Sequence, residues 1–450
     1  MPPNVLLVLA DDLRPGAVGH GGAASTPTID RLARGGTSVR PYTTAPVCMP
    51  GRAELMTGRN AFRNGCRDNG QFPDDGLAML PGALADRGYH TFLAGMWHEL
   101  REPEGEFDET RRVLYRDNQN EMARDGHTMR FPDGAEGNAD ELVADAARDL
   151  LADPPTAPWF GLVGFSAPHI PHTPPEPFDG QYDPADVAVP PNFAYDPVVD
   201  TGTLTENGEL LEDYPRTPRA IRERRADYYG LVSHLDHQVG RVLDAVPPAV
   251  REDTLVVFTA DHGLAVGSHG LLAKQNLFEH TARVPLVASG PGVAAGRRAD
   301  PLCGHYDLFP TLFDLLGLDA SATVEGESYA PVLRGETGAA RDAVFGAYRD
   351  TQRMARAGRW KLVRYHDGRE QLFDVVADPH ETRDLLPDWR GELLAEDPES
   401  VEERVAPWRR QRHPDWAYER AADPDEVAAA LADLRERLAA WQREMDDPLA

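Results

Sequence analysis

The 450-residue chain has few cysteines, almost no lysine and no apolar run of membrane-spanning length. Its cysteines are Cys48, Cys66 and Cys303, an odd number that argues against a disulfide framework. A transmembrane helix needs about 20 mostly apolar residues, so the sequence predicts no such segment. A secretory leader needs a basic segment and a small-residue cleavage site, and neither precedes the apolar run at residues 4–10. We therefore expect a cytoplasmic protein that has no membrane partner.

Positive charge is also scarce in this chain. The net charge is −28, and only Lys274 and Lys361 among the 46 basic residues are lysines. A surface this acidic repels the phosphate backbone, so nucleic acid is excluded as an expected partner. A chain of this kind that acts on an anion has to build a local positive site. The few cations close to a pocket are therefore candidate functional residues.

The first three quarters of the chain alternate between short apolar runs and amphipathic helical patterns. Buried strands are indicated at Asn4–Ala10, 159–165 and 254–259, and helices at 51–57, 139–151 and 222–244. Alternation of this kind predicts an α/β fold, a mostly parallel sheet sandwiched by helices. We expect this main domain to cover residues 1–335.

The pattern changes after about residue 333, where short segments typical of an antiparallel sheet replace the alternation. We expect a smaller C-terminal α+β subdomain over residues 336–450, with a terminal helix at 425–445. Residues 167–218 are too rich in proline and glycine for regular structure, and 100–137 also shows no clear period. Long irregular loops are often binding loops, so we expect both, together with the subdomain, to contact the organic part of a substrate.

Acidic residues directly follow two of the predicted buried strands. Asp11 and Asp12 follow the first, and Asp261 with His262 follows the strand at 254–259. Sites in α/β sheets form at the carboxyl ends of the strands, where these side chains would meet. Adjacent carboxylates favour a divalent cation: oxygen ligands suit Ca²⁺ or Mg²⁺, and an imidazole shifts the preference toward Mn²⁺. Each pair alone is also compatible with a solvated turn.

The most specific motif is Cys-x-Pro-x-Arg at Cys48–Arg52, followed by AELMTGR at residues 53–59. It resembles the maturation signature of the sulfatase family. The likeness continues in family order through five further segments, at residues 4–14, 166–178, 254–263, 267–287 and 371–386. The resemblance implies an alkaline-phosphatase-like fold and the hydrolysis of a small-molecule sulfate monoester to an alcohol and inorganic sulfate.

The resemblance also implies a cofactor set and roles for single residues. Cys48 would be oxidised to formylglycine by a formylglycine-generating enzyme, and the hydrated aldehyde would attack sulfur with one hydroxyl and expel sulfate with the other. One divalent ion, Ca²⁺ ahead of Mn²⁺ or Mg²⁺, would be held by Asp11, Asp12, Cys48, Asp261 and His262. Arg52 would lie beside the alkoxide, and His98 would bond the formylglycine hydroxyl. His169 and Lys274 would contact the ester and its leaving group, and Asn69 would contact the substrate.

Several of these residues are also compatible with ordinary structural roles. His98 and His169 are also compatible with core histidines, and Asn69 with a turn residue in Asp-Asn-Gly. We interpret His172 and His269 as structural histidines or as residues behind the site.

One position departs from the family pattern. The family reads Gly-Lys-x-His where this chain reads Gly95-Met96-Trp97-His98, and a thioether cannot bind an anion. Arg101 is a candidate replacement for that cation. The departure keeps two other functions open: a phosphonate monoester or phosphodiester hydrolase of the same superfamily, and a binding protein that has lost turnover. We predict that Met96 changes substrate choice and leaves catalysis intact. Gly51 is a milder departure, because the family often has serine there.

Overall fold

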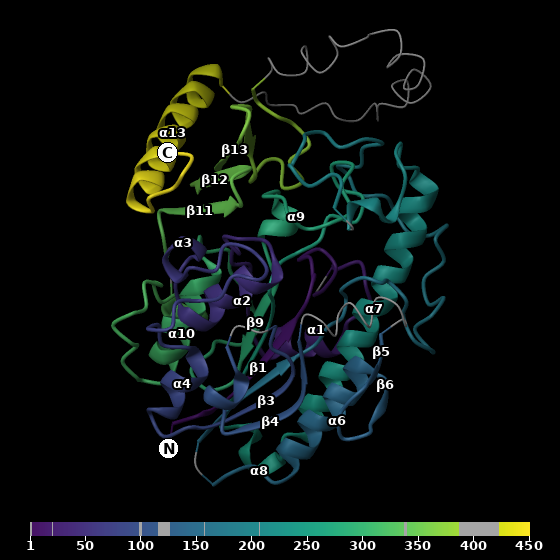
Figure 1. The fold of residues 1–450 in the computed structure, drawn as a ribbon, viewed down its shortest axis with the longest axis vertical. Helices are drawn as coiled ribbons and strands as arrows, with labels where there is room; N and C mark the ends of the chain where they lie inside the picture. The colour runs from purple at the N-terminus through teal and green to yellow at the C-terminus, as the bar shows by residue number, and fades with distance from the viewer. Residues whose placement is uncertain are drawn as a thin grey trace.

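A large mixed sheet forms the centre of the molecule. The computed structural model describes residues 2–19, 21–98, 101–115, 127–156, 158–206, 208–336, 340–386 and 423–450. Within these ranges, an eight-stranded sheet runs in the order β10-β2-β9-β8-β1-β7-β3-β4, and a four-stranded sheet lies above it in Figure 1. Helices cover both faces of the large sheet. The predicted fold class, with its smaller antiparallel part near the C-terminus, is confirmed.

The strands of the large sheet are parallel, apart from β9, which is antiparallel to both β8 and β2. Two further short strands pair outside this sheet as a small ladder. The bounds are β1 (Asn4–Ala10), β2 (Gly36–Val39), β3 (His90–Met96), β4 (Glu109–Leu114), β5 (Thr128–Arg130), β6 (Glu136–Asn138), β7 (Trp159–Gly164), β8 (Thr254–Ala260), β9 (Leu286–Ser289) and β10 (Arg297–Arg298).

Apolar clusters on both faces explain why β1 is apolar throughout. Leu6 and Val8 belong to the cluster that includes residues of α1, α6 and α7, whereas Leu7 and Leu9 belong to the one that includes residues of α2, α4 and α10. A strand buried on both faces shows no alternation. The bounds of the helices are α1 (Pro27–Gly35), α2 (Cys48–Thr57), α3 (Ala61–Asn64), α4 (Leu80–Ala85), α6 (Ala139–Ala152), α7 (Pro218–Ala245), α8 (Pro248–Arg251), α9 (Glu279–Ala282), α10 (Leu308–Leu315) and α11 (Ala330–Leu333), with 3-10 turns at 103–105, 209–211 and 305–307.

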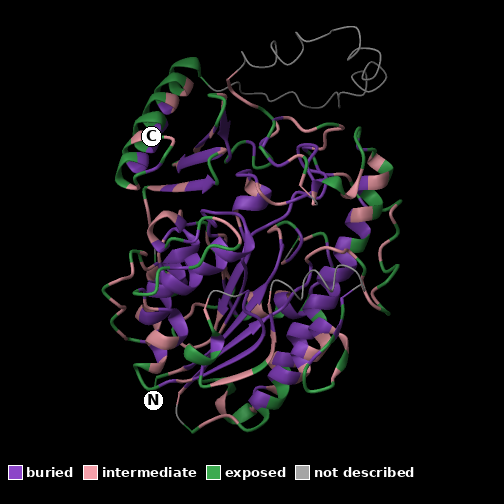
Figure 2. Ribbon diagram, viewed as in Figure 1, coloured by how far each residue is buried: buried purple, intermediate pink, exposed green. Residues whose placement is uncertain are grey.

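The small sheet carries the last helix on one of its faces. It consists of β11 (Ala343–Tyr348), β12 (Gln352–Ala357), β13 (Trp360–Tyr365) and β14 (Glu370–Asp374), all antiparallel. Helix α13 (Pro424–Glu444) packs on it through Leu434, Leu438 and Trp441, while its other side is exposed (Figure 2). The predicted short strands and terminal helix are confirmed. The boundary at residues 335 and 336 stays a prediction.

Two expectations about local structure were wrong. Residues 100–137 were expected to be irregular, but β4, β5 and most of β6 lie in this range. β4 has the sequence ETRRVL and is a half-buried edge strand, so it lacks the apolar run that marks a buried strand. Helix α2 begins at Cys48, before the expected start at Gly51. Residues 167–218 are largely irregular, as expected, and no helix in the described ranges is both long and apolar enough to cross a membrane.

Lys361 connects the small sheet to the main part of the molecule. It lies on β13 with a fully buried side chain, and its Nζ is 2.9 Å from Oε1 of Glu279 and 2.7 Å from Oε1 of Glu381. Glu279 begins α9, and its carboxylate also accepts a hydrogen bond from the hydroxyl of Tyr42. One buried ammonium therefore pairs with two carboxylates between the two sheets, and Arg283 also lies 3.7 Å from Glu279.

We predict that Lys361→Met lowers the free energy of unfolding by about 3–5 kcal/mol at pH 8, because two buried carboxylates lose their cation. The loss should shrink at pH 5, where these carboxyl groups take up protons more readily. Urea unfolding of the metal-free protein at both pH values measures it. Arg359→Met removes an ion pair to Asp374 from a half-exposed arginine and should cost at most about 1 kcal/mol. Equal losses in the two variants would contradict this role of Lys361.

Candidate active site

Two neighbouring strands bring the predicted acidic residues together. β1 pairs with β8 in parallel, with Ala10 opposite Ala260, so Asp11 and Asp261 leave the sheet side by side. Both side chains are fully buried. One Asp261 oxygen, Oδ1, accepts hydrogen bonds from the main-chain N–H groups of Asp12 (3.3 Å) and His262 (2.8 Å). The sequence therefore placed these residues at the correct end of the sheet.

Cys48 begins helix α2 directly beside this acidic edge. Its Sγ lies 3.6 Å from Oδ1 of Asp11, 3.4 Å from Nε2 of His262 and 2.8 Å from Nζ of Lys274. Close approach of the helix depends on Gly51, since a Cβ at that position would lie 2.7 Å from the main-chain oxygen of Asp261. This contact gives a steric reason for glycine where the resembled family often has serine.

Arg52 is the buried cation of the acidic edge. Its Nε lies 3.1 Å from Oδ2 of Asp261 and its Nη2 lies 3.2 Å from Oδ2 of Asp11. Its Nη1 donates to the main-chain oxygen of Met96 at 3.2 Å. Only 1% of the residue is exposed. The guanidinium thus holds the ends of β1, β3 and β8 in one arrangement.

Burial and neighbouring charges shift the pKa values of the acidic residues in different directions. Burial and the neighbouring carboxylate of Asp11 raise the pKa of Asp261 well above its usual value. Burial would also raise the pKa of Asp11, but the positive charges of Lys274, His169 and Arg52 together lower it. Burial lowers the pKa of His262 to about 4, so its imidazole is neutral at pH 7 and able to bind a metal.

The donor atoms fit a divalent cation. One atom each of Asp11, Cys48, Asp261 and His262 lies within 4.8 Å of the others, and Asp11, Asp12 and His169 form a second such group. Asp11 is shared by the two groups. An added double positive charge at this place would let all three carboxylates remain ionised. The five predicted metal ligands are therefore adjacent, with Asp12 on the side of His169.

His169 and Lys274 border the more accessible side of the cluster. The Nζ of Lys274 lies 2.9 Å from Oδ1 of Asp12, and Nε2 of His169 lies 3.9 Å from Oδ2 of the same residue. Nδ1 of His169 bonds the main-chain oxygen of Ile170 at 2.7 Å, which orients Nε2 toward the cluster. Their side chains are 15% and 13% exposed, whereas those of Asp11, Asp12 and Asp261 are at most 2% exposed. An entering ester would meet these two residues first.

Four other singled-out residues lie in the segments that follow β3 or α2, or at the end of β3. His98 is fully buried just after β3, with a φ of 66°. The Oδ1 of Asn69 accepts a hydrogen bond from the main-chain N–H of Met49 at 3.1 Å, next to Cys48. Met96 is fully buried in the apolar cluster that includes residues of α6 and α7. Arg101, the candidate replacement for the missing lysine, bonds Glu106 and two main-chain oxygens.

The two histidines interpreted as structural make packing contacts behind the site. His269 stacks on Phe278 with 3.9 Å between ring centroids, and its Nε2 bonds the main-chain oxygen of Glu381 at 2.9 Å. His172 packs edge-on against Tyr228 at 5.4 Å, and the Tyr228 hydroxyl donates to the main-chain oxygen of Asp12 at 3.0 Å.

Sequence reasoning missed a set of polar residues that connects the segments next to Asn69 and Lys274. Arg349 follows β11 and bonds Asp68 on one side and Glu206 on the other, and Glu206 also bonds Gln275. These residues belong to four separate stretches of the chain. The available signal was their adjacency in sequence to singled-out residues, since Asp68 precedes Asn69 and Gln275 follows Lys274.

Comparisons with known proteins agree with this geometry. The family model described as Sulfatase matches residues 3–318, and the one described as N-sulphoglucosamine sulphohydrolase, C-terminal, matches residues 267–403. The chain is 28% identical over 431 residues to a choline-sulfatase of Rhizobium meliloti, covering 86% of this chain and 83% of that protein. It is 26% identical over 420 residues to a sulfatase of Formosa agariphila, covering 84% and 82%.

Solved structures show the same architecture. The crystal structure of a phosphonate monoester hydrolase of Agrobacterium radiobacter superimposes with a TM-score of 0.71 at 26% identity, covering 91% of this chain and 96% of that one. The two chains share the alkaline-phosphatase-like arrangement of a large sheet between helices.

Proposed function

Because this chain belongs to the sulfatase family and is a sulfuric ester hydrolase, we propose that it cleaves its sulfate monoester with a formylglycine made from Cys48 and one divalent ion. The observation that carries this proposal is the environment of Cys48. Its Sγ lies among a carboxylate, an imidazole and the ammonium of Lys274, at the start of α2. Cationic groups and a helix N-terminus suit an anionic ester and the negative charge that develops during its cleavage.

Residue 48, Asp11, Asp12, Asp261 and His262 would hold the metal ion. The ion would add positive charge that stabilises the ionised hydroxyl of the hydrated aldehyde and the sulfate oxygens. The oxygen-rich donor set suits Ca²⁺ first, with Mn²⁺ or Mg²⁺ as alternatives. Arg52 keeps the carboxylates of Asp11 and Asp261 in place while the ester binds.

Residue 48 contributes two hydroxyl groups after maturation and hydration. One hydroxyl would pass its proton to water and form a bond to sulfur, while the bond from sulfur to the ester oxygen would break. His169 would give a proton to that oxygen and Lys274 would hold it, so that an alcohol departs. The second hydroxyl of residue 48 would then pass its proton to water, its carbon–oxygen double bond would re-form, and the bond from the same carbon to the sulfate oxygen would break, releasing inorganic sulfate.

A second candidate function is the hydrolysis of a phosphonate monoester or a phosphodiester. Two observations favour it: the likeness to a phosphonate monoester hydrolase at 26% identity, and Met96 where the resembled family has lysine. A binding protein without turnover has no comparable support.

We predict that the peptide containing residue 48 is about 18 Da lighter than its cysteine form after co-expression with a formylglycine-generating enzyme, since CH₂SH becomes CHO. The rate of 4-nitrophenyl sulfate hydrolysis should rise in proportion to the converted fraction. Cys48→Ser, which cannot yield the aldehyde without a serine-specific enzyme, is the control. Full activity in a sample that holds only unmodified cysteine would refute the formylglycine proposal, and faster turnover of a phenylphosphonate ester would favour the second function.

We predict that Asp261→Asn abolishes stoichiometric metal binding, because the amide removes one negative charge from the donor set while keeping its shape. Elemental analysis and the thermal shift on adding Ca²⁺ both measure this. A ligand present at 100 times its dissociation constant stabilises by about 2.7 kcal/mol, and the variant should lose that gain. Asp253→Asn, at an exposed carboxylate, should retain it. Unchanged metal content in Asp261→Asn would put the ligand set in error.

We predict that His169→Asn slows the hydrolysis of an alkyl sulfate by about 10²–10⁴-fold, the range typical of a lost general acid. The effect on 4-nitrophenyl sulfate should be far smaller, because nitrophenolate leaves without a proton. His366→Asn, at an exposed histidine after β13, serves as the control. Equal losses on both esters would assign His169 to a different step.

A further inference from the structure

Two residues other than glycine adopt left-handed main-chain conformations close to the site. Gln275, which follows Lys274, has a φ of 66°, and Arg349, in the turn after β11, has a φ of 40°. Such angles are uncommon outside glycine, and they persist where the surrounding structure determines them more than once. Both side chains contact the carboxylate of Glu206. This carboxylate therefore joins two turns that the surrounding structure has to hold in place.

Gln275 is held by three hydrogen bonds. Its main-chain N–H donates to the main-chain oxygen of Pro46 at 3.4 Å, and its main-chain oxygen accepts from Nε2 of Gln352 at 2.9 Å. Its own Nε2 donates to Oε2 of Glu206 at 2.7 Å. Pro46 lies two residues before α2, and Gln352 is fully buried on β12. These bonds fix where the main chain presents the neighbouring Lys274.

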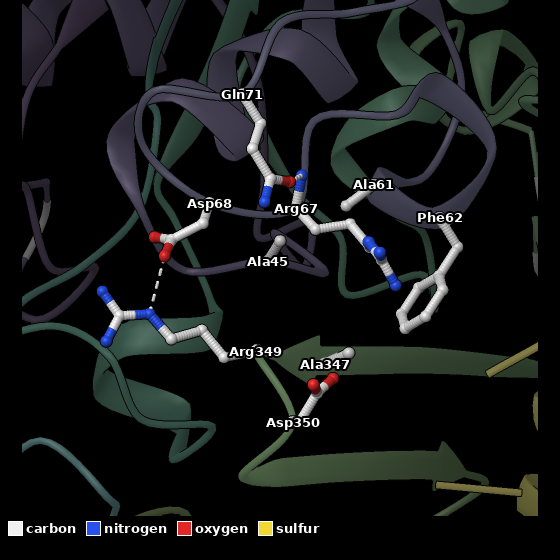
Figure 3. A pocket seen from close by; sticks show the side chains of 9 residues that line it. All are labelled: Ala45, Ala61, Phe62, Arg67, Asp68, Gln71, Ala347, Arg349 and Asp350. Carbon is white, nitrogen blue, oxygen red and sulfur yellow. Dashed lines mark hydrogen bonds and ion pairs between the residues drawn. The ribbon is translucent and has the colours of Figure 1, made fainter. Parts of the chain in front are cut away.

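Arg349 connects Glu206 to the turn that carries Asn69. Its Nη1 lies 2.5 Å from Oε1 of Glu206, and its Nε lies 2.7 Å from Oδ2 of Asp68, the contact drawn as a dashed line in Figure 3. The other oxygen of Asp68 accepts a hydrogen bond from the main-chain N–H of Asn69 at 2.8 Å. The side chain of Asn69 accepts from the main-chain N–H of Met49 at 3.1 Å. One guanidinium of the small sheet thus reaches, through two carboxylates, the two segments that border the start of α2.

The ion pairs of Arg349 form a connected network. The side chains of Asp68, Glu206 and Arg349 are 25%, 30% and 39% exposed. A single pair at such exposure contributes little to stability, but a charged network of fixed geometry restricts the groups that it joins. We therefore expect the network to act on the position of the residues that it holds, and only weakly on the free energy of unfolding.

We propose that Arg349, Glu206 and Gln275 are positioning residues for the reaction. Through Glu206, the guanidinium holds Lys274 where its ammonium reaches the leaving oxygen of the ester. Through Asp68, it holds the turn that is expected to contact the substrate. The inference rests on the sulfate-ester activity proposed above. Misplacing a group by about 1 Å can slow a reaction by about 10²-fold, so a network that binds no substrate can still control the rate.

Steady-state kinetics of the matured, Ca²⁺-loaded enzyme with an alkyl sulfate and 4-nitrophenyl sulfate test the two arms separately. Glu206→Ala should lower kcat about tenfold for the alkyl sulfate and less than about threefold for 4-nitrophenyl sulfate, because nitrophenolate leaves without help from Lys274. Asp68→Ala should instead raise KM about tenfold for both esters and leave kcat nearly unchanged. Arg349→Met should combine the two effects.

Two further variants decide whether these effects come from positioning. Glu206→Gln keeps an oxygen that accepts the hydrogen bond of Gln275, so it should retain most of the kcat that Glu206→Ala loses. Arg369→Met removes an ion pair to Asp367 in another turn of the small sheet and should change neither kcat nor KM. A uniform loss on both esters in every variant would indicate general destabilisation and overturn the proposal.

Hydrogen exchange followed by mass spectrometry separates this inference from the proposed function, because it needs no turnover. Arg349→Met should speed exchange at least about threefold in the peptides that contain residues 69 and 275, both remote in sequence from the substitution. Arg369→Met should leave both peptides unchanged. Unaltered exchange in Arg349→Met would overturn the positioning role even if sulfate esters are hydrolysed. Faster exchange in a matured enzyme that hydrolyses no sulfate ester would support the network and overturn the proposed function alone.

Discussion

The pairing of Arg52 with Asp11 and Asp261 is the interaction on which the rest of the site depends. Two carboxylates at adjacent strand ends repel each other strongly once they are buried, and one guanidinium between them reduces this repulsion. The same residue lies on α2, one turn after Cys48, so the pairing also fixes where residue 48 points. Gly51 permits this approach because it brings no Cβ against Asp261. The position of residue 48 is thus a consequence of charge pairing.

Both lysines of this lysine-poor chain lie beside carboxylates. Lys274 lies beside Cys48 and Asp12, and Lys361 lies between Glu279 and Glu381. A chain with a net charge of −28 attracts no anion over long distances, and salt screens such fields within about 10 Å. Recognition of an anionic ester therefore has to come from short-range contacts with buried cations, where the effective dielectric is low.

The small sheet belongs to the site as well as to the fold. Its β11–β12 turn presents Arg349 to Asp68 and Glu206, and Lys361 on β13 anchors the sheet to α9. A shift of this sheet would move Arg349 relative to Lys274. The stability of the contact between the two sheets and the position of Arg349 are therefore linked through the same rigid element.

The sequence by itself determined the parallel centre of the fold, since runs such as NVLLVLA and TLVVFTA are buried on both faces, and it determined that Asp11 and Asp261 lie side by side, since they end those strands. The Cys48 motif consists of consecutive residues, so it can be recognised from the sequence alone. Edge strands such as β4 were not predicted from the sequence, because a half-covered strand needs no apolar run. Only the tertiary structure decided that Asp68, Glu206 and Arg349 meet, because long-range pairing of surface charges leaves no periodic signal in the sequence. It also decided that Met96 packs in the apolar core while its main-chain oxygen binds Arg52, because the direction of a strand-end side chain depends on what the sheet packs against.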